Sequence, residues 1–311
     1  MITPFDNDVA NAPKKFRAEW LTTTDTVRLR TVYWEQTDRS KGTIFVLEGA
    51  TENIEKKGPL IDELFKNGFS VSALDWRGHG LSDRLTDDRL KSHVVEFADF
   101  QLDLDALLLH ANKNNFPKPW FVVAHSLGAC IALRSIYNGA QFAACSFTAP
   151  MWALNIPKPK QIVALPLAYL SKSIGKGDAY VPGASGDSYV LSNPFEGNRL
   201  TRDPAMFEFY RHVSRSLPDQ VLGGVTMSWL LGALREMKSL SKLSPPKIPS
   251  AVFCGSADPV VDTATSEARM AAWEEGSFEL FKDAKHDISC EIPEVREKFV
   301  SDTCALFSKF K

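Results

Sequence analysis

Short apolar runs alternate along the chain with longer segments in which apolar residues recur at helical spacing. The short runs are rich in β-branched and aromatic residues, which predicts strands at 27–34, 42–47, 69–74, 120–124, 142–148, 251–254 and 278–281. Helices are predicted in the later part of 54–68, ending at Gly68, and at 97–112, 126–139, 205–216, 225–240, 263–273 and 293–310. Strands that alternate with helices need crossover connections, so we predict an α/β fold: a mostly parallel central sheet flanked by helices.

This alternation stops between residues 151 and 246. That segment is rich in proline and glycine, and residues 175–194 (GKGDAYVPGASGDSYVLSNP) follow no regular period. The alternation then resumes at residue 251. We therefore predict one core made of residues 1–150 and 247–311, with residues 151–246 inserted into it as a helical cap subdomain.

Composition and charge narrow the classes of protein. A chain of 311 residues with 44% hydrophobic residues can bury one sizeable core and an inserted subdomain. The formal net charge of -2 provides no field that would attract phosphate backbones, so we expect no nucleic-acid partner. We expect neither a signal peptide nor a membrane span, and five scattered cysteines without a Cys-x-x-Cys pair favour a reducing cytoplasm.

The sharpest local motif is Ala-His-Ser-Leu-Gly at residues 124–128, between a predicted strand and a predicted helix. A tight strand-to-helix turn lifts a serine hydroxyl above the sheet, and it needs small residues on either side of the serine. Ala124 and Gly128 meet that need, although the usual pattern has glycine at the first of these positions. Ser126 is the candidate nucleophile; the competing interpretation is that it only caps the helix.

A serine nucleophile needs a base and an acid that orients the base. His286 follows the last predicted strand, and Asp258 follows the one before it, so both are expected in loops at strand ends. The chain order Ser, Asp, His is the order typical of this arrangement. Asp262 is a rival acid, but it is better placed to cap the next helix, and Asp287 is expected to be solvated.

Two backbone N-H groups are candidates for an oxyanion hole. One is the N-H of Leu127, at the start of the helix after the serine, where the helix dipole favours negative charge. The other is the N-H of Ala50, in the loop after the strand at 42–47, where Gly49 lets the backbone approach a substrate closely. Glu48 is expected to be a solvated loop acid without a catalytic role.

Four blocks of the sequence resemble bacterial lysophospholipases and monoacylglycerol lipases of the α/β-hydrolase superfamily. They are LEGATENIEKKGPLIDELFKNGFSVSALDWRGHGLSDR, AHSLGA, GSADPVV and AKHDI, within a match from about residue 42 to residue 299. The resemblance implies a triad of Ser126, Asp258 and His286, an oxyanion hole at Ala50 and Leu127, and a cap that shapes an acyl pocket. It also implies a structural role for the DWRGHG block.

One departure from the family pattern bears on the substrate. Its first oxyanion block commonly opens with His-Gly, whereas this chain has Glu48-Gly49, as do some members similar to lysophospholipases. The hypothesis is therefore a serine hydrolase that cleaves esters of lysophospholipids or monoacylglycerols without a cofactor or metal. A carboxylesterase for small soluble esters and a catalytically silent binding protein are the alternatives. Oligomeric state and transient contact of the cap with membranes stay open.

Overall fold

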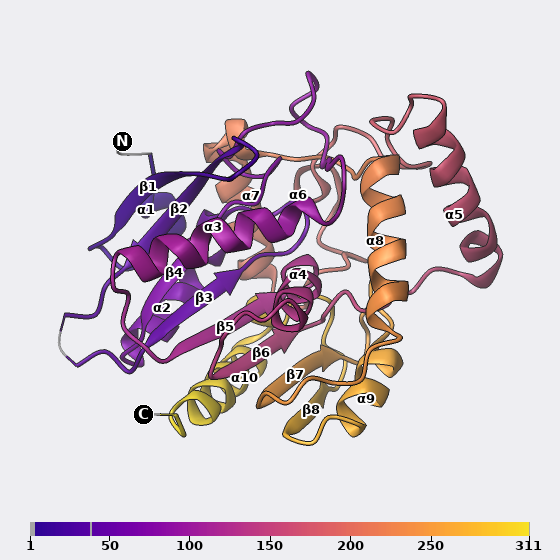
Figure 1. The fold of residues 1–311 in the computed structure, drawn as a ribbon. Helices are drawn as coiled ribbons and strands as arrows, with labels where there is room; N and C mark the ends of the chain where they lie inside the picture. Colours follow the sequence, from indigo (N-terminus) through magenta and orange to yellow (C-terminus); the bar gives the residue numbers. More distant parts are fainter. Residues whose placement is uncertain (1–3, 38, 311) are drawn as a thin grey trace.

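The computed structural model describes residues 4–37 and 39–310 and contains an eight-stranded sheet in the order β1-β2-β4-β3-β5-β6-β7-β8 (Figure 1). The strands are β1 (Arg17–Thr22), β2 (Arg28–Trp34), β3 (Thr43–Leu47), β4 (Ser70–Leu74), β5 (Trp120–His125), β6 (Ala144–Thr148), β7 (Ser250–Gly255) and β8 (Gly276–Phe281). Only β2 runs against its neighbours; β4, β3 and β5 to β8 are parallel. The predicted α/β class and mostly parallel sheet are confirmed.

Helices cover both faces of the sheet, which explains why the central strands β3, β4 and β6 are buried at every position. On β3, Phe45 and Leu47 belong to one core cluster, whereas Ile44 and Val46 belong to the other. Helices α3 (Asp99–Lys113), α4 (Leu127–Tyr137) and α9 (Thr263–Ala271) pack on the first face. Helices α2 (Gly58–Lys66) and α10 (Pro293–Phe307) pack on the second.

Residues 149–249, between β6 and β7, add helices but no strand to the sheet. They form α5 (Lys158–Ser173), α6 (Tyr189–Ser192), α7 (Pro204–Ser216), the short 3-10 helix η2 (Pro218–Gln220) and α8 (Met227–Leu240). Helix α8 packs against the core through Trp229 and Met237, and α5 lies beside α8 at the outside of the molecule (Figure 1). The segment 151–246, where the predicted strand-helix rhythm stops, lies within this range.

Two short helices complete the loops around the sheet. The 3-10 helix η1 (Ile54–Lys57) precedes α2, and η3 (Ile288–Cys290) precedes α10, while the four-residue helix α1 (Asn7–Ala10) lies near the amino terminus. Within the described residues, none of the helices is both long and apolar enough to cross a membrane.

The sequence pattern does not predict β1 or α5, nor the short helices α1, α6, η2 and η3. Predicted ends differ by a few residues elsewhere: the helix expected to end at 310 ends at Phe307, and the helix expected to end at 273 ends at Ala271.

Candidate active site

Ser126 occupies a strained turn between β5 and α4. Its backbone has φ 47° and ψ -108°, a conformation that residues other than glycine rarely adopt. The turn is tied down because the Ser126 N-H donates to the Thr148 carbonyl at 3.0 Å and the Met151 N-H donates to the Ser126 carbonyl at 3.0 Å. The Ser126 side chain makes no capping hydrogen bond to α4, so helix capping does not explain the residue.

Close contact between α4 and the end of β3 explains the glycine at position 128. An alanine Cβ there would lie 2.4 Å from the Leu47 carbonyl oxygen and 2.8 Å from the Glu48 carbonyl oxygen. At the other side of the serine, Ala124 is buried in β5 opposite Leu47 and Phe147. The sheet accommodates its methyl group without losing strand pairing.

The structure brings Ser126, His286 and Asp258 together as a hydrogen-bonded chain at the carboxyl ends of the parallel strands. The Nε2 atom of His286 lies 3.1 Å from the Ser126 Oγ atom, and its Nδ1 atom lies 2.8 Å from Asp258 Oδ2. The second carboxylate oxygen of Asp258 accepts from the N-H groups of Val260 at 2.7 Å and Val261 at 3.2 Å. Those bonds fix the carboxylate in one orientation. The side chains of Ser126, His286 and Asp258 are all buried.

The two other candidate acids have different roles. Asp262 caps α9 by accepting from the Ala264 N-H, as predicted. The expectation that Asp287 is solvated is wrong: its side chain is fully buried and lies 2.9 Å from the Lys57 ammonium. Burial alone would raise the pKa of Asp287, but the nearby Lys57 charge outweighs it and holds that pKa well below its usual range.

Ala50 lies in the loop after β3, and the carbonyl oxygens of Leu47 and Glu48, just before it, lie against Gly128 at the start of α4. Neither the Ala50 N-H nor the Leu127 N-H has an acceptor in the part of the chain that the structure describes. Glu48 is not the solvated acid that we expected, because its side chain is buried and its carboxyl oxygens have no hydrogen-bond partner among the described residues. Burial and the neighbouring charges of Asp75 and Glu52 raise the pKa of Glu48 well above its usual value.

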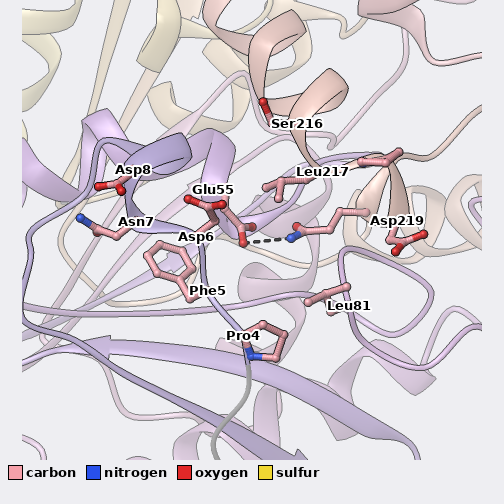
Figure 2. A pocket seen from close by; sticks show the side chains of 12 residues that line it. Pro4, Phe5, Asp6, Asn7, Asp8, Glu55, Leu81, Ser216, Leu217 and Asp219 are labelled. Atoms are coloured by element: carbon pink, nitrogen blue, oxygen red, sulfur yellow. Dashed lines mark hydrogen bonds between the residues drawn. The ribbon is translucent and has the colours of Figure 1, made fainter.

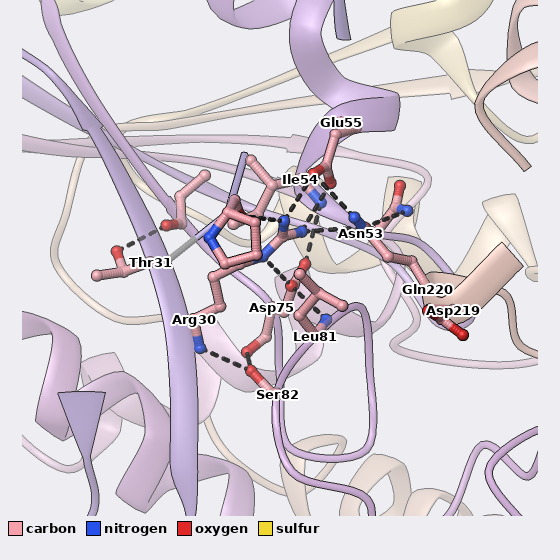
Figure 3. Close-up of polar contacts among 12 residues, drawn as sticks. Arg30, Thr31, Asn53, Ile54, Glu55, Asp75, Leu81, Ser82, Asp219 and Gln220 are labelled. Carbon is pink, nitrogen blue, oxygen red and sulfur yellow. Dashed lines mark hydrogen bonds and ion pairs between the residues drawn. The ribbon is translucent and has the colours of Figure 1, made fainter. Parts of the chain in front are cut away.

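A buried network of charged side chains anchors the end of the loop after β3 (Figure 3). The Arg30 guanidinium donates to both carboxylate oxygens of Glu55 and to Asp75, each at 2.6 Å. Asp75 also accepts from the Ile54 N-H at 3.1 Å, and the Gln220 side chain joins the network from η2. These bonds give Asp75 and the DWRGHG block a structural role.

A second polar cluster, which the sequence does not predict, lies beside the catalytic candidates. Donor atoms of Glu52, His125 and Asp287 lie within 4.8 Å of one another, a spacing that could hold a metal ion. However, the Lys57 ammonium already lies 2.8 Å from Glu52 and 2.9 Å from Asp287, so this cluster holds a cation of the chain itself. The sequence did not predict this cluster, because the spacing of Glu52 and Asp287 along the chain does not reveal that both bind Lys57.

A pocket of about 580 Å³ lies elsewhere, between the N-terminal segment and the turn at 216–220 (Figure 2). Phe5, Leu81 and Leu217 line it together with the acidic side chains of Asp6 and Asp219. None of the predicted site residues lines this pocket, so it is separate from the Ser126 site.

The parallel sheet, the strained serine turn and the hydrogen-bonded histidine and aspartate define an α/β-hydrolase. A family model described as serine aminopeptidase, S33 matches residues 38–293. The chain belongs to this family.

Curated relatives with related sequences include lysophospholipases. A probable lysophospholipase L2 of Haemophilus influenzae is 25% identical over 255 residues, which cover 81% of this chain and 79% of the relative. Lysophospholipase L2 of Escherichia coli is 28% identical over 191 residues, which cover 60% of this chain and 54% of the relative. The second match therefore spans about half the length of the Escherichia coli protein.

Solved structures with the same fold include monoacylglycerol lipases. A soluble variant of monoglyceride lipase from Saccharomyces cerevisiae, in complex with a substrate analog, matches with a TM-score of 0.72 at 21% identity, over 99% of each chain. Monoacylglycerol lipase of Paleococcus ferrophilus matches with a TM-score of 0.71 at 20% identity, over 91% of this chain and 99% of that one. These similarities support the α/β-hydrolase fold.

Proposed function

We propose that this protein hydrolyses carboxylic esters of lipid-like substrates, either lysophospholipids or monoacylglycerols. In this proposal Ser126 is the nucleophile, His286 the general base and Asp258 the carboxylate that orients the histidine. The observation that carries the proposal is the hydrogen-bonded chain from Asp258 through His286 to the Ser126 Oγ atom, at a strained turn. The lysophospholipase relatives and the monoacylglycerol lipase structures support the substrate class.

The geometry accounts for acyl transfer in two steps. His286 Nε2 accepts the Ser126 proton while the serine oxygen attacks the ester carbonyl, and Asp258 stabilises the imidazolium that forms. His286 then donates that proton to the leaving alcohol, which leaves an acyl-enzyme on Ser126. Water attacks the acyl-enzyme while His286 takes one of its protons. His286 then returns that proton to the leaving Ser126 oxygen, which releases the fatty acid and restores the serine hydroxyl.

Negative charge develops on the carbonyl oxygen in both steps. We assign its stabilisation to the N-H groups of Ala50 and Leu127, which have no other acceptor among the described residues. Because Leu127 opens α4, the helix dipole adds to the effect. The positions of both donors depend on the close approach of α4 to the end of β3 at Gly128.

The insertion at residues 151–246 is proposed to be a cap over this site. Its segment at 199–200 reaches the base loop, because the His286 N-H donates to the Arg199 carbonyl at 3.2 Å and the Asp287 N-H donates to the Leu200 carbonyl at 2.9 Å. The cap is therefore bonded directly to the loop that carries the proposed general base.

Helix α5 of the cap is proposed to contact lipid surfaces transiently. Its exposed apolar side chains include Ile162 at 76%, Val163 at 58%, Tyr169 at 58% and Leu170 at 56% relative exposure. Residues 156–177 contain four lysines and no acidic residue. An exposed apolar face with basic residues nearby suits the boundary of an anionic membrane, where the proposed substrates reside. The five free cysteines are consistent with a cytoplasmic setting for this contact.

The test is a panel of esters hydrolysed by purified protein and by its Ser126→Ala variant. The panel contains lysophosphatidylcholine, lysophosphatidylethanolamine, monoacylglycerol and short nitrophenyl esters. We expect long-chain lipid esters to give the highest kcat/KM and the variant to lose nearly all turnover. Faster turnover of short soluble esters would replace the lipid assignment with a carboxylesterase, and equal turnover by the variant would overturn the proposed nucleophile.

A further inference from the structure

Lys57, at the end of η1, lies between the two loops that form the proposed site. Its side chain is buried, and its Nζ atom lies 2.8 Å from Glu52 Oε1 and 2.9 Å from Asp287 Oδ2. The Tyr210 hydroxyl on α7 is 3.2 Å away, and the Ser289 Oγ atom is 3.5 Å away. One ammonium group therefore contacts the loop after β3, the loop after β8 and the insertion.

The Glu52 end of this contact acts on the loop that carries Ala50. The second carboxylate oxygen of Glu52 accepts from the Gly49 N-H at 2.6 Å, directly before Ala50 in the chain. A Cβ there would lie 2.8 Å from the His125 Cδ2 atom and 3.0 Å from Glu52 Oε2, so a larger residue would force these side chains to move. Glu52 therefore helps to fix the orientation of the backbone that presents the Ala50 N-H.

The Asp287 end acts on the loop that carries His286. Asp287 directly follows His286, and its carboxylate accepts from the Tyr210 hydroxyl at 2.7 Å and from the Ser289 hydroxyl at 2.6 Å. Burial alone would lower the pKa of Lys57, but the carboxylates of Asp287 and Glu52 outweigh it and raise that pKa. Lys57 is therefore a permanent cation held by two acids.

The charge balance of this cluster bears on both proposed catalytic elements. Burial lowers the pKa of His125 to about 4, so this neighbour of the His286 ring is neutral at neutral pH. Lys57, Glu52 and Asp287 together carry one net negative charge. Further ionisable groups around this cluster and the His286 ring are Glu48, Lys56, Tyr210, Asp258 and Cys290. Removing the Lys57 charge leaves two buried carboxylates without their counter-charge.

We propose that Lys57 is a positioning residue of the hydrolytic site, an inference that rests on the proposed function. Its two ion pairs fix the Ala50 loop relative to the His286 loop and neutralise one of the carboxylates behind them. Without this cation, the extra negative charge disfavours the oxyanion and favours the protonated imidazole. The first effect lowers kcat, and the second moves the acidic limb of the pH-rate profile upward.

The test compares Lys57→Met with Asp287→Asn on a soluble ester, with Lys66→Met as the control. Lys66 forms an ion pair with Asp62 on the exposed side of α2, away from both loops. For Lys57→Met we expect kcat to fall by about 10- to 100-fold. Its KM should stay within about threefold, and the acidic limb should rise by about half to one pH unit.

Asp287→Asn should move the same limb in the opposite direction. It removes a negative charge and leaves the Lys57–Glu52 pair in place, so it stays informative if Lys57→Met fails to fold. Lys57→Arg should restore most of kcat, and the control should match wild type.

The positioning role would be overturned if Lys57→Met and Asp287→Asn moved the acidic limb of the pH-rate profile in the same direction. It would also be overturned if both variants kept the wild-type kcat and showed no shift of that limb. Turnover by Ser126→Ala at the wild-type rate would instead overturn the proposed function, whatever the Lys57 variants do.

Discussion

Replacing Gly128 by alanine tests whether the contact between α4 and β3 sets the proposed oxyanion hole. The new Cβ would lie 2.4 Å from the Leu47 carbonyl oxygen, whereas ordinary contacts begin at about 3.4 Å. The Leu47 oxygen belongs to the β3 backbone and cannot rotate away as a side chain could. The start of α4 must therefore move by about 1 Å from the end of β3.

That movement separates the two proposed oxyanion donors. Leu127 moves with α4, whereas Ala50 stays with the loop after β3. Displacement by about 1 Å can cost about 100-fold in rate, and loss of one oxyanion donor costs about 10²- to 10³-fold. We therefore expect Gly128→Ala to lower kcat by about 100-fold, equivalent to about 2.7 kcal/mol of activation free energy.

The assay is steady-state hydrolysis of a nitrophenyl ester, with the free energy of unfolding measured in parallel. Gly139→Ala is the matched control. Gly139 has φ +101°, and apart from its chain neighbours no heavy atom of the described residues lies within 4 Å of the position that a Cβ would take. Alanine there therefore strains the backbone by about 1 kcal/mol without touching the site. The control should lose stability and keep kcat. A kcat of Gly128→Ala within about threefold of wild type would refute the link between the α4 contact and the oxyanion hole.

Three further predictions concern the triad, acid stability and the cap. Asp258→Asn should lower kcat by about 10³- to 10⁴-fold in steady-state assays while the fold is retained, because the amide cannot stabilise the imidazolium; near-normal kcat would contradict the role of Asp258. Burial lowers the pKa of His79 to about 4 from its ordinary value of 6.5. The unfolded chain therefore binds the extra proton first, and stability falls as the pH drops from about 6.5 toward 4. Denaturant titrations should show that His79→Asn lessens the loss of unfolding free energy between pH 7 and pH 4.5 by about 2 to 3 kcal/mol; an unchanged loss would contradict this. The double variant Ile162→Ser, Leu170→Ser should weaken flotation with anionic vesicles by about tenfold or more and leave turnover of soluble esters unchanged; equal flotation would exclude α5 as the contact.

The central strands and the chain order of the proposed triad residues could be predicted from the sequence, because both depend on local physical requirements. Strands covered on both faces are buried almost throughout, as β3 and β5 are, so they are visible as short runs dominated by apolar residues. The turn at Ser126 needs small neighbours, and Gly128 reflects that steric demand in the sequence. Local requirements of this kind can be inferred without coordinates.

The missed elements lack such a local signal. Strand β1 lies at the edge of the sheet and buries only Ala18 and Leu21, so its pattern does not alternate cleanly. Helix α5 contains Pro159 in its first turn and Pro166 in its interior, and these prolines obscure its helical period. A proline is common in the first turn of a helix, so Pro159 could have indicated that a helix begins there.

The burial of Asp287 and Glu48 could not be predicted for a different reason. Glu48 is buried without a hydrogen-bond partner among the described residues, which no local pattern reveals. Asp287 is held by a partner far away in sequence, since Lys57 is 230 residues from it. Their ion pair forms only after the sheet has brought the loops of β3 and β8 to the same edge. The sequence motifs that contain Lys57 and Asp287 therefore do not reveal that these two residues pair.

Covalent labelling of the nucleophile tests the central claim most directly. A fluorophosphonate reacts with a serine that a neighbouring base activates, and peptide mass spectrometry identifies the modified residue. The account predicts one adduct, on Ser126, whose formation parallels the loss of ester hydrolysis and is nearly abolished in His286→Ala. An adduct on another serine, or full hydrolysis by protein completely labelled at Ser126, would contradict it.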